Sequence, residues 1–187
     1  DILWVINRKC IDMRDEDLEI IPGERIGPYY LKWDIETLKK HLPANYRFSE
    51  GPYVWNLKFE EYFIRVRKID KQIDTIAVKN KFKHHFKNRI TCDSTLGQID
   101  DDFGITEDRG MADILPAYPG MEFYFEDEDE NDENEDRWRK IKIEAIVIYD
   151  PSFIWDEHFS SEDYKKMKEN QFECPFPKDK LVESVDD

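Results

Sequence analysis

The sequence predicts an α+β protein built from two tandem repeats, each a helix followed by a three-stranded antiparallel meander, with the helices packed on one face of the sheet. Three observations lead to this prediction. Two segments carry apolar residues at helical spacing, two later segments alternate as half-buried strands do, and corresponding positions keep a nearly constant offset. We place the first repeat at residues 20–82 and the second at 83–153.

The two predicted helices share one apolar pattern with an offset of 61 residues. Its positions are Ile35, Leu38 and Leu42 in the first copy, and Leu96, Ile99 and Phe103 in the second. Asp34 is placed to cap the first helix and Pro43 to stop it. Ser94 or Thr95 is placed to cap the second helix, and Gly104 to end it.

Each helix is followed by strand signals: "YVWNLKF" and "YFIRV" in the first copy, "MADIL" and "MEFYF" in the second. The closing strands "QIDTIAVK" and "KIEAIVIY" then align with an offset of 70 residues. The matched positions are Ile73, Ile76 and Val78 against Ile143, Ile146 and Ile148. The second copy has therefore gained nine residues, and the acidic run 126–136 lies in that interval. We expect this run to be a lengthened hairpin loop.

Two terminal segments flank the repeats. Residues 1–19 form an N-terminal extension that suits either an added strand or a short helix. Residues 154–187 form a C-terminal tail, with a helix capped by Ser160 or Ser161 and acidic residues in its first turn. We expect one compact domain overall.

Short motifs in each copy carry a resemblance. The stretches "PGERIGPYYL" and "ITCDSTLGQI" resemble the lead-ins of the tandem helix-plus-sheet units found in the β-lactamase-inhibitor-like fold and in small outer-membrane assembly lipoproteins. The resemblance covers about residues 20–153 and implies helices packed on a sheet. The lipidated cysteine near a signal peptide is absent, which argues against the envelope role of the lipoproteins.

Charge and cysteine content limit the partners and the cellular location that we expect for the protein. The formal net charge is −15, and residues 126–136 supply nine of those negative charges. Such a balance repels nucleic acid and anionic lipid and attracts basic proteins or cations. Cys10, Cys92 and Cys174 are widely spaced, as expected of reduced thiols, and "ILWVI" is too short for a signal peptide or membrane span. We expect a cytoplasmic protein without membrane or nucleic-acid partners.

The acidic run permits three interpretations. It is a solvated loop, or a partner-binding surface that competes with the phosphates of a nucleic acid for a cationic groove, or a weak cation site. An EF-hand loop counted from Asp127 needs glycine at its sixth position and glutamate at its twelfth. Those positions hold Asp132 and Trp138, so we predict no metal site there.

Catalytic and cofactor motifs are missing from the sequence. There is no nucleophile elbow, Walker loop or H-E-x-x-H pattern. His84 and His85 lie among lysines, where we expect a loop between the repeats, and His158 suits a structural role. The sequence therefore predicts neither an enzyme nor a cofactor, although a hydrolase with a scattered site stays open.

An acidic cytoplasmic chain of this size is similar to the immunity proteins that bacteria pair with basic toxins, many of them nucleases. The resemblance implies a non-enzymatic inhibitor, monomeric alone, that binds and neutralises a basic toxin. The alternative is a structural or accessory module that self-associates through its sheet edge. The predicted partner-binding residues are Glu126, Asp127, Glu128, Asp129, Glu130, Asp132, Glu133, Glu135 and Asp136, together with Trp33 and Trp55.

Overall fold

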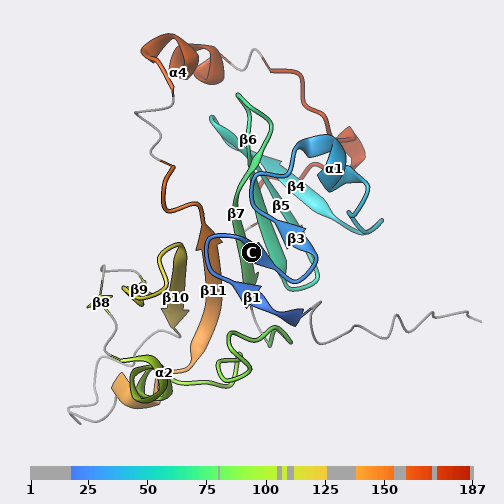
Figure 1. Ribbon diagram of the computed structural model, residues 1–187. Coiled ribbons are helices and arrows are strands. Elements are labelled where there is room, and N and C mark those ends of the chain that lie inside the picture. Colours follow the sequence, from blue (N-terminus) through green and yellow to red (C-terminus); the bar gives the residue numbers. More distant parts are fainter. Residues whose placement is uncertain are drawn as a thin grey trace, which may run out of the picture.

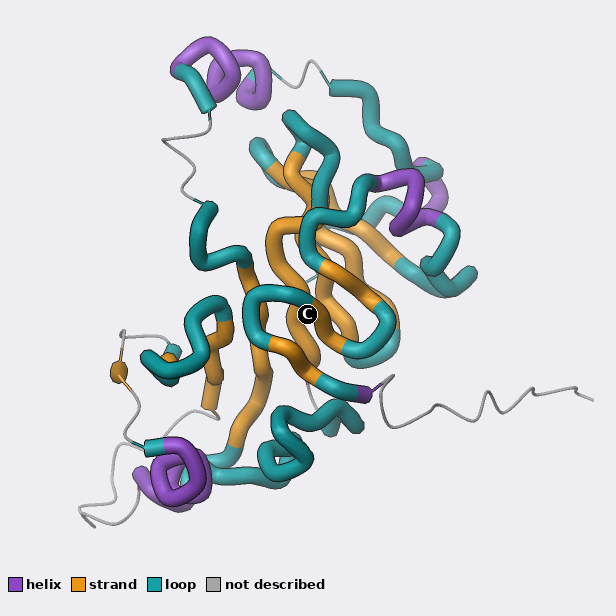
Figure 2. Tube along the Cα trace, in the orientation of Figure 1, coloured by secondary structure: helices purple, strands orange, loops and turns teal. Residues whose placement is uncertain are grey.

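The structure is a computed structural model that describes residues 18–79, 81–104, 107–108, 112–125, 138–153, 159–169 and 172–185. Strands dominate this part of the chain (Figure 1). They form one large sheet and one small sheet, and short helices lie near the ends of the strands (Figure 2).

The large sheet has eight strands in the order β4-β5-β6-β7-β11-β10-β9-β8. Every neighbouring pair is antiparallel. The strands are β4 (Arg47–Glu50), β5 (Val54–Phe59), β6 (Tyr62–Arg67), β7 (Ile73–Lys79), β8 (Glu107–Asp108), β9 (Asp113–Ile114), β10 (Met121–Phe125) and β11 (Ile143–Tyr149). The segment that joins β10 to β11 contains the acidic run, which lies outside the described residues.

Strands β7 and β11 pair at the centre of the large sheet. Ile76 lies opposite Ile148 and Val78 opposite Ile146. All four side chains are 0% exposed. Because successive side chains of a strand point to opposite faces, these residues define a core face, and the residues between them define an outer face.

A small three-stranded sheet covers the core face (Figure 1). Its strands are β1 (Ile20–Ile21), β2 (Arg25–Ile26) and β3 (Tyr29–Tyr30). Gly23 and Gly27 have φ values of 68° and 55°, which permit the tight turns between these strands. The segment after β3 is held to β7, since the Lys32 N–H donates to the Ile73 carbonyl at 2.9 Å and the Ile73 N–H donates to the Trp33 carbonyl at 3.0 Å.

The helices begin where the sequence predicts. They are α1 (Ile35–Lys39), α2 (Leu96–Phe103) and α4 (Ser161–Lys168), with 3-10 turns η2 (Trp138–Lys140) and η3 (Lys178–Lys180). The side chains of Asp34, Thr95 and Ser160 accept hydrogen bonds from the backbone of the first turn of α1, α2 and α4. These three predicted caps are confirmed. No helix in the described ranges is long and apolar enough to cross a membrane.

The predicted fold class, two repeats of a helix followed by a three-stranded meander, is wrong. The described chain is mostly β, and α1 and α2 have only five and eight residues. The Ile35 N–H bonds to the Lys71 carbonyl and the Leu96 N–H to the Ile141 carbonyl, so each helix is tied to a strand connection instead of forming a layer. The layer over the core is the small sheet, and most of it is formed by the stretch "PGERIGPYYL", which the sequence predicts to be a helix lead-in.

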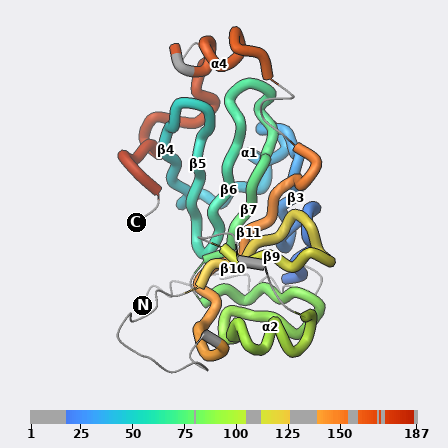
Figure 3. Tube along the Cα trace, turned by 90° about the vertical axis from the view of Figure 1, so that its left-hand side faces the viewer, coloured from blue at the N-terminus to red at the C-terminus, as the bar shows by residue number. Residues whose placement is uncertain are grey.

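The C-terminal segment occupies one edge of the large sheet. Figure 3 shows it beside β4. The Val182 N–H donates to the Phe48 carbonyl at 2.9 Å, and Phe48 and Leu181 form an isolated parallel bridge. Phe176 packs on Phe48 and Trp55 with ring centroids 5.1 and 6.1 Å apart. This contact satisfies part of the hydrogen-bonding edge that β4 would otherwise expose.

Gly120 and Gly104 provide a matched test of the packing beside β10. Both have positive φ, 85° and 94°. A Cβ at Gly120 would meet the Tyr149 carbonyl oxygen at 2.6 Å and the Gly23 Cα at 2.9 Å, whereas a Cβ at Gly104 meets nothing within 4 Å. Gly104→Ala should lower the free energy of unfolding by about 1–2 kcal/mol through backbone strain alone. Gly120→Ala should cost about 2 kcal/mol more, because backbone must shift. Urea denaturation measures both, and equal losses would contradict this packing.

Candidate functional site

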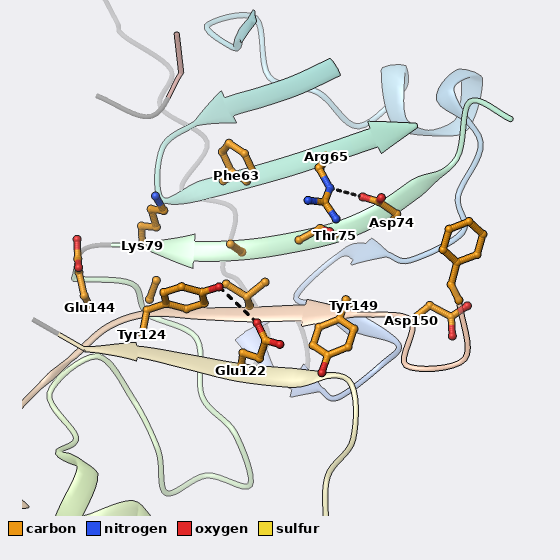
Figure 4. Close-up of a pocket in the computed structure, with 14 residues that line it drawn as sticks. Phe63, Arg65, Asp74, Thr75, Lys79, Glu122, Tyr124, Glu144, Tyr149 and Asp150 are labelled. Atoms are coloured by element: carbon orange, nitrogen blue, oxygen red, sulfur yellow. Dashed lines mark hydrogen bonds and ion pairs between the residues drawn. The ribbon is translucent and has the colours of Figure 1, made fainter. Parts of the chain in front are cut away.

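The outer face of the large sheet is hollowed into a pocket of about 510 Å³, which we call the trough (Figure 4). Strands β6 and β7 contribute Phe63, Arg65, Asp74, Thr75, Ala77 and Lys79. Strands β10 and β11 contribute Glu122, Tyr124, Glu144, Ala145, Val147 and Tyr149. Asp150 and Phe153 close one end. A hollow of this size is within the usual range of ligand pockets.

Strand register explains the hollow. Phe63 lies opposite Ala77, Ala77 opposite Val147, and Val147 opposite Glu122, so one row crosses four strands. The two middle positions are small and the two outer positions are large. Side chains on the outer face stand roughly perpendicular to the sheet, and the central strands therefore form a floor between two walls.

A β-bulge places a carboxylate at the floor. Arg65 pairs with Thr75 and Val66 with Ile73, which leaves Asp74 as the extra residue of β7. The Asp74 side chain is 4% exposed, and its Oδ1 accepts a hydrogen bond from the Arg65 Nε at 2.8 Å (Figure 4). In a regular strand Asp74 and Thr75 would point to opposite faces of the sheet. The bulge instead turns Asp74 toward the outer face as well.

Two buried oxygens beside this ion pair have no hydrogen-bond partner among the described residues. They are Asp74 Oδ2 and Thr75 Oγ1. Leaving such a group unsatisfied costs roughly 1–3 kcal/mol. Buried unsatisfied groups in a native protein call for an explanation, and a bound molecule or ion is one. The trough floor therefore offers hydrogen-bond acceptors.

Strand β10 supplies a second acceptor at the opposite wall. The Tyr124 hydroxyl donates to Glu122 Oε2 across 3.4 Å, a long hydrogen bond. Burial, and then the charge of Glu122, raise the pKa of Tyr124. The phenol therefore stays protonated as a donor, and the Glu122 carboxylate keeps capacity for a closer partner.

The end of the trough is held by an ion pair. The Lys32 ammonium lies 2.8 Å from Asp150 Oδ2, and the Ser152 hydroxyl and N–H donate to Asp150 Oδ1 at 2.6 and 3.0 Å. Burial disfavours the charged carboxyl, but these donors outweigh it and lower the pKa of Asp150 to about 2. Beside it, the Arg67 guanidinium lies 3.9 Å from the centre of the Phe153 ring.

The trough is mildly acidic. Its lining has four carboxylates and two cations. Asp74 is paired with Arg65, and Asp150 with Lys32 from outside the lining. The lining has no serine, cysteine or histidine, which form the commonest nucleophile and base pairs. In the described part of the chain, no group of three or more His, Cys, Asp or Glu residues is arranged to hold a metal ion.

Neither of the two predicted partner-binding residues that the structure describes, Trp33 and Trp55, lines the trough. The acidic residues 126–136 lie outside the described residues. Trp55 is 0% exposed in the core, so its ring is not presented to a partner. Trp33 is half-buried and stacks on the exposed Tyr30, with ring centroids 5.3 Å apart. Tyr30 belongs to β3 and Trp33 follows that strand, on the side of the large sheet that the small sheet covers (Figure 1).

The structure shows the burial and the contacts of His84 and His85, which the sequence alone did not predict. His84 is 1% exposed, and its Nε2 lies 2.5 Å from the Tyr62 hydroxyl. His85 is half-buried and its backbone bonds to Leu18 and Ile20. His158 lies outside the described residues. His84 lies in the irregular segment between β7 and α2, as predicted, and its side chain is buried.

The residues that shape the trough were missed because each has an ordinary sequence context. Arg65, Glu122 and Tyr124 occupy the polar positions of alternating strands, where solvent exposure is expected. The usable signal was the pair of consecutive polar residues Asp74 and Thr75, which interrupts the alternation of "QIDTIAVK" and marks the bulge.

No family model matches the chain, and no curated protein matches it. Among solved structures, the chain is similar to the uncharacterized protein yfeY from Escherichia coli, with a TM-score of 0.50 and 11% identity. The similarity covers 69% of this chain and 98% of that one. At this identity the likeness concerns the fold alone.

His84 predicts a pH dependence of stability. Burial, with a smaller contribution from His85, lowers the pKa of His84 from 6.5 to about 4. Above pH 6.5 the imidazole is neutral in both states. Between the two values the unfolded chain binds a proton that the folded chain does not, so the free energy of unfolding falls as pH falls, by up to about 3 kcal/mol.

Histidine-ring NMR measures this pKa directly. We expect one ring to stay neutral down to about pH 4. Glu61 Oε1 lies 3.5 Å from His84 Nδ1. A His84 ring that titrates at or above 6.5 would mean that Glu61 holds a charged imidazole, and would contradict the prediction.

Proposed function

We propose that the protein is a non-enzymatic binding protein that neutralises a basic partner protein, as an immunity-type inhibitor of a toxin does, and that the trough face is its contact surface. One observation carries this proposal. Among the described residues, the outer face of the sheet has a hollow with aromatic side chains in its walls, an apolar stretch of floor at Ala77, Ala145 and Val147, and more carboxylates than cations. A pocket that receives an anchor side chain is typical of the centre of a protein interface.

Charge supports a basic partner. The chain carries −15, and nine of its acids belong to the segment that connects β10 to β11. Those two strands supply Glu122, Tyr124, Glu144 and Tyr149 to the trough. The acidic run is therefore attached in sequence to a wall and to the floor of the proposed contact surface. Long-range attraction of this kind raises the association rate and makes binding dependent on salt.

The alternative of self-assembly through sheet edges has less support. The β4 edge is occupied at Phe48 by Leu181 and Val182. At the other end, β8 has two residues, too few for an extended ladder. We also propose a cytoplasmic location, because Cys92 and Cys174 are free thiols, as is usual in a reducing compartment.

The trough is tested by filling it. Val147→Trp places a large ring over the floor, and Lys40→Trp places the same ring on an exposed position at the end of α1. A basic protein captured from the source organism is purified and titrated against both variants by calorimetry. We expect Val147→Trp to weaken binding by roughly a hundredfold, as loss of a central anchor does, and Lys40→Trp to bind like the wild type. Equal affinities would contradict the proposed surface.

The acidic run is tested in the same titrations. A variant with all nine acids of residues 126–136 changed to serine should bind more slowly and lose most of its salt dependence. Glu24→Ser with Glu36→Ser, two exposed acids outside the run, is the control. If the nine-serine variant keeps the wild-type rate and salt dependence, the run has no part in binding. If no basic protein is captured, the inhibitor proposal fails.

A further inference from the structure

Acceptors face each other across the trough. On β7, Asp74 Oδ2 and Thr75 Oγ1 are buried without a hydrogen-bond partner among the described residues. On β10, the Glu122 carboxylate receives a long hydrogen bond of 3.4 Å from the Tyr124 hydroxyl. The two carboxylates accept hydrogen bonds and cannot donate them, and the Thr75 hydroxyl can accept as well as donate, so the three groups together favour a ligand rich in N–H donors.

The separation of strands β7 and β10 leaves room for a small planar group. Strand β11 lies between β7 and β10, so their backbones are about 10 Å apart, twice the usual spacing of neighbouring strands. Side chains from β7 and β10 extend into that distance. A guanidinium with donors on both edges can lie over Val147 and hydrogen-bond to both sides.

The cations of the trough are already engaged, which disfavours an anionic ligand. The Arg65 Nε bonds to Asp74, and the Lys79 ammonium lies 5.8 Å from the centre of the Phe63 ring. The aromatic wall at Tyr124 favours a flat cation, because guanidinium groups stack on aromatic faces and hydrogen-bond in their own plane. An ammonium has neither property to the same degree.

We propose that the trough is the anchor subsite for one arginine side chain of the basic partner, with its guanidinium between Glu122 on the β10 wall and Asp74 and Thr75 on the β7 side of the floor. This inference rests on the proposed function for the source of the arginine, but its chemistry can be tested without the partner. The aliphatic stem of the arginine would lie along the apolar floor formed by Ala77 and Val147.

The test uses N-acetyl-L-arginine methylamide as the probe and the full-length chain labelled for NMR. N-acetyl-L-citrulline methylamide, which has the same shape without the charge, is the matched control ligand. We expect the arginine amide to shift the resonances of Ala77, Ala145 and Val147 in a saturable way, and the citrulline amide to bind roughly tenfold more weakly. Equal binding of the two ligands would overturn the proposed charge recognition.

Variants on the two sides of the trough, with a remote control, distinguish loss of a contact from a general effect of mutation. Glu122→Gln and Thr75→Val keep side-chain size, and each should weaken the arginine amide roughly fivefold to tenfold. Glu36→Gln on α1, with a side chain 72% exposed, should leave its affinity unchanged. Thermal melts of all variants check that they fold. Unchanged affinity in both Glu122→Gln and Thr75→Val would overturn the inference.

Failure of this inference can be told apart from failure of the proposed function. If the arginine amide leaves the trough resonances unmoved while the captured basic protein binds and is blocked by Val147→Trp, the surface is correct and the arginine subsite is wrong. If the amide binds in the trough but no basic protein is captured, the subsite stands and the inhibitor role is rejected.

Discussion

The rest of the structure depends on the pairing of β7 with β11. These strands are about 70 positions apart in sequence, yet they lie side by side, and their core-face residues Ile76, Val78, Ile146 and Ile148 are fully buried. Each such side chain contributes roughly 1.5–3 kcal/mol when it leaves water. Strands β4 to β6 extend the sheet on one side and β10 to β8 on the other. The segment after the small sheet is tied to the same ladder through Ile73.

The two faces of the β7–β11 ladder differ in side-chain size and packing. On the core face, large apolar side chains pack under the small sheet. On the outer face the same strands carry Thr75, Ala77, Ala145 and Val147, which are too small to fill the space between the walls on β6 and β10. The bulge at Asp74 adds a buried carboxylate to this floor. The hollow, its polarity and its place at the sheet centre thus follow from register and side-chain size.

Sequence patterns predicted local features better than the architecture. The caps at Asp34, Thr95 and Ser160 were predictable, because a cap depends on residues one turn away. The small sheet was not, since two-residue strands between Gly23 and Gly27 leave no period to read. The trough was missed for a related reason: strands β7 and β10 are placed on the two sides of β11 by long-range pairing, which no local pattern contains.

The most direct measurement is hydroxyl-radical footprinting of the protein alone and in complex with its basic partner. Two aromatic surfaces compete as the contact: the trough with Tyr124 and Tyr149, and the stacked pair Tyr30 and Trp33 on the core side of the large sheet. The account predicts that the complex protects Tyr124 and Tyr149 from oxidation, while Tyr30, which is 36% exposed, keeps its rate. Protection of Tyr30 and Trp33 with unchanged trough tyrosines would contradict it.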